Sequence, residues 1–121
     1  MTASENTIRP TAPLPALPDR ALVVLIGPSG SGKSTFAHAH FTSTQIVSSD
    51  ACRAMVADSE ADQTATAAAF AVLHCITEQR LRAGRCTVID ATNVQAKARR
   101  PLLALAARYH RPTVAILFQT S

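Results

Sequence analysis

Residues that could bind and transfer phosphate stand at three places in the sequence. The first is the run from Gly27 to Thr35, which fits the pattern G-x-x-x-x-G-K-[ST]. Glycines let such a loop curl until several backbone N–H groups point at one anion. We expect Lys33 to reach the terminal phosphates of a nucleotide and the Ser34 hydroxyl to ligate Mg²⁺. The predicted nucleotide contacts are Gly27, Ser29, Gly30, Ser31, Gly32, Lys33, Ser34 and Thr35.

The second place is Asp50, which follows a short apolar segment and precedes Arg53 by three positions. An aspartate here could act as a general base that takes the proton from an attacking hydroxyl. Arg53 would lie on the same helix face and could hold a phosphate of the acceptor beside that base. Two simpler interpretations remain open, because Asp50 is also a favoured helix N-cap and the two residues could form a plain surface ion pair.

The third place is Asp90, which ends the apolar run Thr87-Val88-Ile89. An aspartate that ends a buried strand next to a phosphate loop is a typical position for a residue that holds Mg²⁺, directly or through water. Ser34 and Asp90 are therefore the predicted metal ligands. Thr92 and Asn93 could supply a hydrogen bond to the loop or cap the next helix, and we expect capping.

These residues need a parallel sheet to bring them together. Apolar runs predict four strands, and the segments between them have helical patterns. Because the strands are continuously apolar and alternate with helices, we expect an α/β fold of the three-layer P-loop type, with a mainly parallel sheet covered on both faces. Ligands bind at the carboxyl ends of such strands, so the loop, Asp50 and Asp90 should converge. The expected strands are 21–26, 45–48, 86–89 and 113–118, and the expected helices are 33–41, a short one ending near 57, 64–83 and 95–109.

Two local signals bear on the helix ends. Gly84 follows the long third helix and should end it, because glycine tolerates a positive φ. Pro101 falls within the fourth helical pattern and should either start that helix or kink it.

Length and composition indicate one globular domain, with 121 residues, 47% hydrophobic and 17% charged. Residues 1–19 hold four of the seven prolines and no periodic pattern, so we expect a flexible lead-in there and the folded domain at 20–121. The longest apolar run, 21–26, is far shorter than the roughly 20 residues that span a bilayer. We therefore expect a cytoplasmic protein without a membrane partner.

Charges are segregated along the chain. Residues 50–62 carry four acidic side chains against Arg53, whereas residues 80–111 carry eight basic ones against Asp90. The basic stretch could attract a polyanion, or it could be ordinary solvated helix surface. Three widely spaced cysteines, Cys52, Cys75 and Cys86, suit neither a disulfide framework nor zinc, and we expect them to be buried.

The three sites together resemble a known family. Gly27–Thr35, the segment Ser48-Ser49-Asp50-Ala51-Cys52-Arg53 and the segment Asp90-Ala91-Thr92-Asn93 look like the kinase module of the bacterial polynucleotide kinase-phosphatases. The resemblance covers about residues 21–118. It implies ATP and Mg²⁺ as cofactors, Lys33 and Ser34 at the ATP phosphates, Asp50 as general base and Arg53 on the acceptor phosphate. The implied reaction is transfer of the ATP γ-phosphate to a 5′-OH end of RNA or DNA.

Members of that family continue past the fourth strand into a lid helix whose arginines hold the ATP phosphates. This sequence ends at Ser121, so we expect a kinase-like domain that is incomplete at its C-terminus, without the charge neutralisation that a lid supplies.

Two alternatives stay open. One is a P-loop kinase of small molecules, such as a sugar or nucleoside, which needs the same loop and base but no basic track. The other is a nucleotide-binding module without transfer activity. A GTPase is disfavoured because the sequence has no N-K-x-D motif, and an AAA-type motor because the chain is short. No motif distinguishes ATP from GTP or indicates an oligomeric state.

Overall fold

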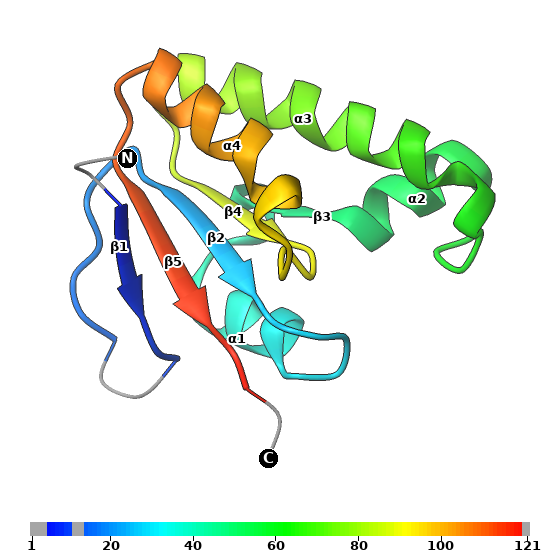
Figure 1. Cartoon of the computed structure of the whole chain (residues 1–121), viewed down its shortest axis with the longest axis horizontal. Coiled ribbons are helices and arrows are strands. Elements are labelled where there is room, and N and C mark those ends of the chain that lie inside the picture. Colours follow the sequence, from blue (N-terminus) through cyan, green and yellow to red (C-terminus); the bar gives the residue numbers. More distant parts are fainter. Residues whose placement is uncertain (1–4, 11–13, 120–121) are drawn as a thin grey trace.

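Five parallel strands form one sheet, in the order β1-β5-β2-β4-β3 (Figure 1). This computed structural model describes residues 5–10 and 14–119. Four of the strands lie where apolar runs predicted them, which confirms the α/β fold with a parallel sheet. The strands are β1 (Glu5–Ile8), β2 (Leu22–Ile26), β3 (Ile46–Ser48), β4 (Thr87–Asp90) and β5 (Thr113–Leu117).

The four expected helices are present, with ends that differ from the expected ones by a few residues at most. Gly84 follows the third helix with φ 75°, as expected for a glycine that ends a helix. Pro101 lies inside the fourth helix, so it does not start that helix. The helices are α1 (Lys33–His40), α2 (Ser49–Ala57), α3 (Thr66–Arg82) and α4 (Ala96–Arg108), and short 3-10 turns precede β3 and α3 at Ser43–Gln45 and Gln63–Ala65.

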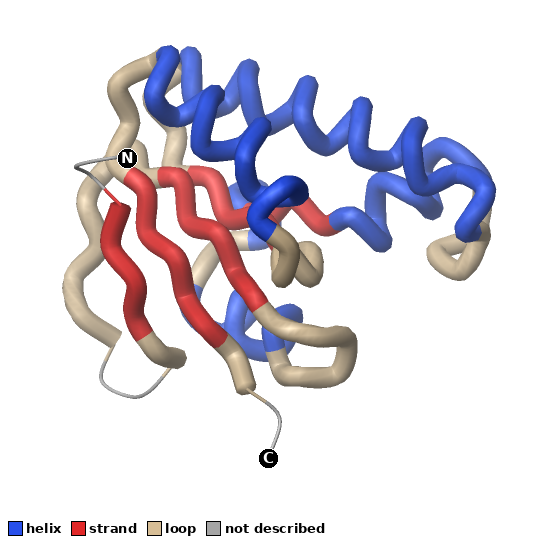
Figure 2. Tube along the Cα trace, in the orientation of Figure 1, coloured by secondary structure: helices blue, strands red, loops and turns tan. Residues whose placement is uncertain are grey.

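Both faces of the sheet are buried. Leu22 and Val23 are neighbours on β2, yet Leu22 packs with Leu73 of α3 and Leu102 of α4, whereas Val23 packs with Ala37 of α1. Side chains alternate across a strand, so α3 and α4 cover one face and α1 covers the other (Figure 2). Each fully buried leucine stabilises the fold by about 1.5–3 kcal/mol. The expected three-layer arrangement is confirmed.

The expectation for residues 1–19 needs a correction. Within that segment Glu5–Ile8 forms β1, which pairs in parallel with β5 from Glu5↔Thr113 to Ile8↔Ile116. Ile8, Leu14 and Leu17 pack against the cluster on the α1 face, which ties the segment to the domain. The sequence E-N-T-I has a single large apolar residue, so it lacks the pattern of an inner strand. Residues 1–4 and 11–13 of the predicted lead-in lie outside the described residues.

The cysteines are not uniformly buried, contrary to expectation. Cys52 is buried, Cys86 is half-buried and Cys75 is exposed on α3. Within the part of the chain that the structure describes, no helix is both long enough and apolar enough to cross a membrane.

Candidate active site

The loop between β2 and α1 uses its glycines in two ways. Gly30 and Gly32 adopt φ 80° and 97°, a left-handed conformation that other residues rarely adopt. Gly27 is instead needed for close packing, because a Cβ there would lie 2.8 Å from both the Phe118 Cβ and the Ser31 hydroxyl. Its N–H donates to the Thr92 carbonyl over 2.9 Å, which joins the loop to the segment after β4.

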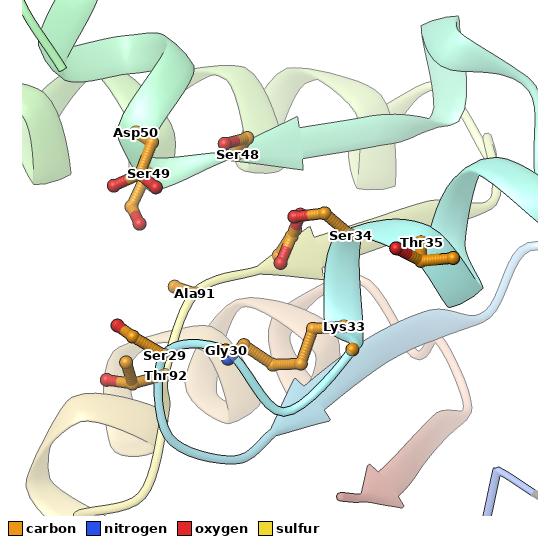
Figure 3. Close-up of a pocket in the computed structure, with 12 residues that line it drawn as sticks. Ser29, Gly30, Lys33, Ser34, Thr35, Ser48, Ser49, Asp50, Ala91 and Thr92 are labelled. Atoms are coloured by element: carbon orange, nitrogen blue, oxygen red, sulfur yellow. The ribbon is translucent and has the colours of Figure 1, made fainter.

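Lys33 begins α1 and is only 7% exposed. Its Nζ donates to the carbonyls of Gly27 over 2.8 Å and Pro28 over 2.9 Å, so the side chain runs back along the loop (Figure 3). Burial lowers the pKa of Lys33 below its usual value, and the charges of Asp90 and Asp50 oppose that shift. The loop thus holds the ammonium group of Lys33, which the charges of Asp50 and Asp90 stabilise.

Ser34 and Asp90 meet directly. The Ser34 hydroxyl donates to Oδ2 of Asp90 over 2.6 Å, although the residues lie 56 positions apart in sequence. Asp90 is buried at the carboxyl end of β4, in register with Leu25 of β2 and Ser48 of β3. Mg²⁺ prefers oxygen ligands and usually takes one or two from protein, with phosphate and water completing the shell. This hydroxyl–carboxylate pair fits such an ion.

Asp50 lies in the first turn of α2, with 65% of its side chain exposed. It is not the N-cap of that helix, contrary to one of the open interpretations. The cap is Ser48, whose hydroxyl accepts from the Ala51 N–H over 3.1 Å. The Asp50 carboxylate is therefore not used in helix capping, and Asp50 lines the cavity (Figure 3).

Arg53 is buried beneath Asp50 rather than exposed in a surface pair. Its Nη1 donates to Oδ1 of Asp50 over 2.9 Å and to the Glu60 carbonyl over 3.1 Å. Only 9% of its side chain is exposed, and its buried Nε has no hydrogen-bond partner among the described residues. Arg53 thus bonds both to the candidate base and to the loop that follows α2.

Asn93 does not cap α4, contrary to expectation. The N-cap of α4 is Gln95, which makes no side-chain capping bond. Asn93 is buried with φ 53°, and its Nδ2 donates to the carbonyls of Leu25 over 2.9 Å and Ala91 over 3.1 Å. Arg99 of α4 also contacts this segment, because its Nη1 donates to the Asn93 carbonyl over 2.8 Å. The segment after β4 is tied to β2 by these bonds.

These elements enclose a cavity of about 330 Å³ at the carboxyl end of the sheet (Figure 3). Eight predicted residues line it, whereas Gly27, Ser31 and Arg53 do not. Four further lining residues were not among the predicted nucleotide, catalytic or metal residues, and each of them is next to, or one residue removed from, Asp50 or Asp90 in the chain. The predicted lining residues are Ser29, Gly30, Gly32, Lys33, Ser34, Thr35, Asp50 and Asp90, and the further ones are Ser48, Ser49, Ala91 and Thr92.

Several solved structures share this fold, among them the following two. A chain of the Pnkp1/Rnl/Hen1 complex has 24% sequence identity and a TM-score of 0.70, over 84% of this chain and 36% of that one. A candidate kinase from Chloroflexus aurantiacus J-10-fl has 19% identity and a TM-score of 0.71, over 84% of this chain and 59% of that one. This chain thus spans less than two thirds of either neighbour. No curated protein matches the sequence.

Comparison with protein families assigns most of the sequence. A family model described as an AAA domain matches residues 22–121, from β2 through all the elements that line the cavity. This family match does not test motor activity, so the absence of an AAA-type motor function stays a prediction. The chain has a P-loop kinase-like fold and belongs to the AAA domain family.

Proposed function

We propose that this domain is an ATP-dependent kinase that transfers the γ-phosphate to a 5′-OH end of RNA or DNA. The observation that carries the proposal is one cavity lined by Lys33 and Ser34 from the loop, Asp90 from β4 and Asp50 from α2. One small cavity thus holds groups that could bind phosphate, bind a metal ion and accept a proton.

The loop would bind the ATP phosphates through its backbone N–H groups and the N-terminus of α1. Lys33 would exchange its bonds to the Gly27 and Pro28 carbonyls for bonds to phosphate oxygens. Those new bonds would be stronger, because donor and acceptor are both charged. Mg²⁺, held by Ser34 and Asp90, would neutralise part of the charge on the phosphates when bound. Ser34 would turn its hydroxyl proton away from Asp90 to take up that role.

Asp50 would then take the proton of the attacking hydroxyl. The hydroxyl oxygen forms a bond to the γ-phosphorus, the bond from that phosphorus to the bridging oxygen breaks, and ADP leaves with the electron pair. The exposed carboxylate of Asp50 suits this role because the acceptor can approach it from solvent. Arg53 would hold the carboxylate in place, and it could contact an acceptor phosphate after giving up its bond to Asp50 or to the Glu60 carbonyl.

The resemblance of the three sequence segments to polynucleotide kinases supports a polynucleotide acceptor. The chain also shares its fold with a chain of the Pnkp1/Rnl/Hen1 complex. Lys97 and Arg100 are exposed on α4, which follows the cavity-lining Thr92, and they could attract an acidic strand. A reaction that uses ATP is consistent with a cytoplasmic location, which we also propose.

The test incubates the chain with Mg²⁺, γ-labelled ATP and a 5′-OH oligonucleotide, beside Lys33→Ala and Asp50→Asn. We expect label on the oligonucleotide from the wild type and at least a ~100-fold loss in both variants. Asp58→Asn is the matched control, because it removes one charge from the C-cap of the same helix outside the cavity. Label that persists in Asp50→Asn would refute the base assignment, and no label with the wild type would refute this acceptor.

The alternatives make different predictions in the same assay. A kinase of small neutral acceptors would label a sugar or nucleoside, with little dependence on salt. A binding module without transfer activity would be stabilised by ATP against heat and would label nothing.

A further inference from the structure

A second polar cavity lies at the opposite end of the sheet from the candidate active site. It has a volume of about 760 Å³ and is bordered by the segment before β2, the end of α1 and the turn between α3 and β4. These segments meet at the amino ends of the strands, which we call the amino edge (Figure 1). The proposed kinase chemistry uses no residue of this cavity.

Arginines dominate the charge of the amino edge. Arg20, Arg80 and Arg85 line the cavity, and Asp19 is the one carboxylate among its lining residues. None of these arginines forms an ion pair with a carboxylate among the described residues, and neither does Asp19. The cavity therefore has a positive charge that is not balanced within the described chain.

Two guanidinium groups converge at Gly84. A Cβ on Gly84 would lie 3.4 Å from Nε of Arg20 and 3.7 Å from Nη2 of Arg111. Both guanidinium groups therefore lie beside the same glycine, and their like charges repel one another. An anion placed between them would turn that repulsion into attraction.

Hydrogen bonds to backbone carbonyls use some of the donors of these arginines. Arg111 donates to the carbonyls of Leu81 over 2.7 Å and Arg82 over 3.3 Å, and Arg80 donates to the Cys86 carbonyl over 2.8 Å. The bonds of Arg111 satisfy carbonyls at the negative end of α3, as basic residues commonly do, whereas the bond of Arg80 goes to the segment before β4. The side chains of Arg20 and Arg85 donate to no described acceptor, and Nε of Arg80 is buried without a described partner. Arginine donors that these backbone bonds do not use thus remain at the cavity.

From this arrangement we infer that the amino edge is a phosphate-binding site, separate from the candidate active site. Guanidinium groups bind phosphate oxygens in pairs of parallel hydrogen bonds, and Arg20 and Arg85 have their donors free for such bonds. His40, Thr42 and Thr44 add polar groups to the lining. The phosphate could be free or part of a polynucleotide backbone.

The test is an NMR titration of the ¹⁵N-labelled chain with sodium pyrophosphate at constant ionic strength. Amides at the amino edge (Thr42 and Gly84) report this site, and amides of Gly30 and Gly32 report the nucleotide loop. We expect both groups to shift, and we expect the double variant Arg20→Gln/Arg85→Gln to weaken the response of Thr42 and Gly84 by about tenfold or more while the loop responds as before.

The matched control is Arg9→Gln/Arg108→Gln, which removes the same charge from exposed positions outside the cavity. Equal losses in the control and the test variant would overturn the proposal, as would wild-type shifts confined to Gly30 and Gly32. If the double variant does not fold, Arg85→Gln alone changes a side chain without described hydrogen bonds and should still weaken the response.

A second titration uses a 5′-phosphorylated single-stranded oligonucleotide and identifies the source of the phosphate. Shifts of Thr42 and Gly84 whose midpoint rises steeply with salt indicate a polynucleotide backbone. Shifts with pyrophosphate but not with the oligonucleotide indicate a small phosphate compound. If neither ligand shifts Thr42 and Gly84, the proposal is overturned. Because the readout needs neither ATP nor transfer, a failure here is distinguishable from a failure of the proposed kinase reaction.

Discussion

The two ends of the sheet carry polar cavities that differ in how their charges are balanced. At the carboxyl end, Lys33 has Asp50 and Asp90 acting on it, and its donors are bonded to loop carbonyls. At the amino edge, Arg20 and Arg85 have no described carboxylate or carbonyl partner. The first cavity is held in shape by internal bonds that a ligand must replace, whereas the second has donors ready for an anion. The same sheet can thus bind phosphate in two ways, and the following predictions test that difference.

Lys33→Met should separate the two cavities most strongly. It removes the charged donor of the loop, so we expect affinity for ATP to fall by ~100-fold or more. The pyrophosphate response of the Gly84 amide should not change. Isothermal titration measures the first effect and NMR the second. Lys97→Met, an exposed substitution on α4, should leave ATP binding within about twofold of wild type, and parallel losses in both readouts would show that the cavities are coupled.

Asp90→Asn should affect only the carboxyl end. The substitution removes the carboxylate next to the Ser34 hydroxyl, so the Mg²⁺ concentration needed for ATP to stabilise the fold should rise by about tenfold. Thermal unfolding with ATP at several Mg²⁺ concentrations gives the measurement. Asp58→Asn is the control, since asparagine tolerates the φ of 60° there. An unchanged Mg²⁺ requirement in Asp90→Asn would remove Asp90 from the metal site.

A glycine at each end gives a matched pair of stability measurements. Gly27→Ala would place a Cβ 2.8 Å from the Phe118 Cβ, so we expect a loss of about 1–3 kcal/mol in the free energy of unfolding. Gly84→Ala has a positive φ of 75°, but its nearest contact is the movable Arg20 side chain, so the loss should be about 1 kcal/mol. Urea unfolding tests the order, and a larger loss for Gly84→Ala would contradict the packing argument.

The smallest expected effect is a change in the pH dependence of stability, and it comes from His74 on α3. His74 lines neither cavity. Burial lowers its pKa below the usual 6.5, so below that pH the unfolded chain takes up a proton that the folded chain does not. Stability should therefore decrease as the pH falls from about 7.5 to 5.5, and His74→Asn should weaken that dependence. Urea unfolding at both values measures it. An equal slope in the variant would exclude His74 as a source.

Sequence patterns predicted the inner part of the molecule better than its periphery. Strands β2 and β4 are apolar over both faces, so their pattern identifies them without knowledge of the rest of the fold. Asp90 ends β4 and Asp50 comes shortly after β3, and parallel topology alone brings them to the same end as the loop. Spacing in the chain was therefore enough to predict which elements form the cavity.

Residues whose roles depend on other segments could not be predicted in this way. Arg53 is buried and donates to the Glu60 carbonyl, and nothing in the helix that carries Arg53 indicates that contact. Asn93 bonds to the Leu25 carbonyl 68 positions away, so its local pattern suggested a helix cap instead. The convergence of Arg20 and Arg111 at Gly84 likewise depends on three distant segments.

The pairing of β1 with β5 has a consequence for how the chain acquires its structure. Glu5 lies opposite Thr113, so the first strand in the sequence can join the sheet only when the last one is available. Contacts between residues so far apart in sequence require a large loop closure and generally form slowly. During synthesis β1 cannot pair with β5 until residues 113–117 have left the ribosome. We therefore expect the β1 edge to form last, and its amides to exchange with solvent faster than those of β2 and β4.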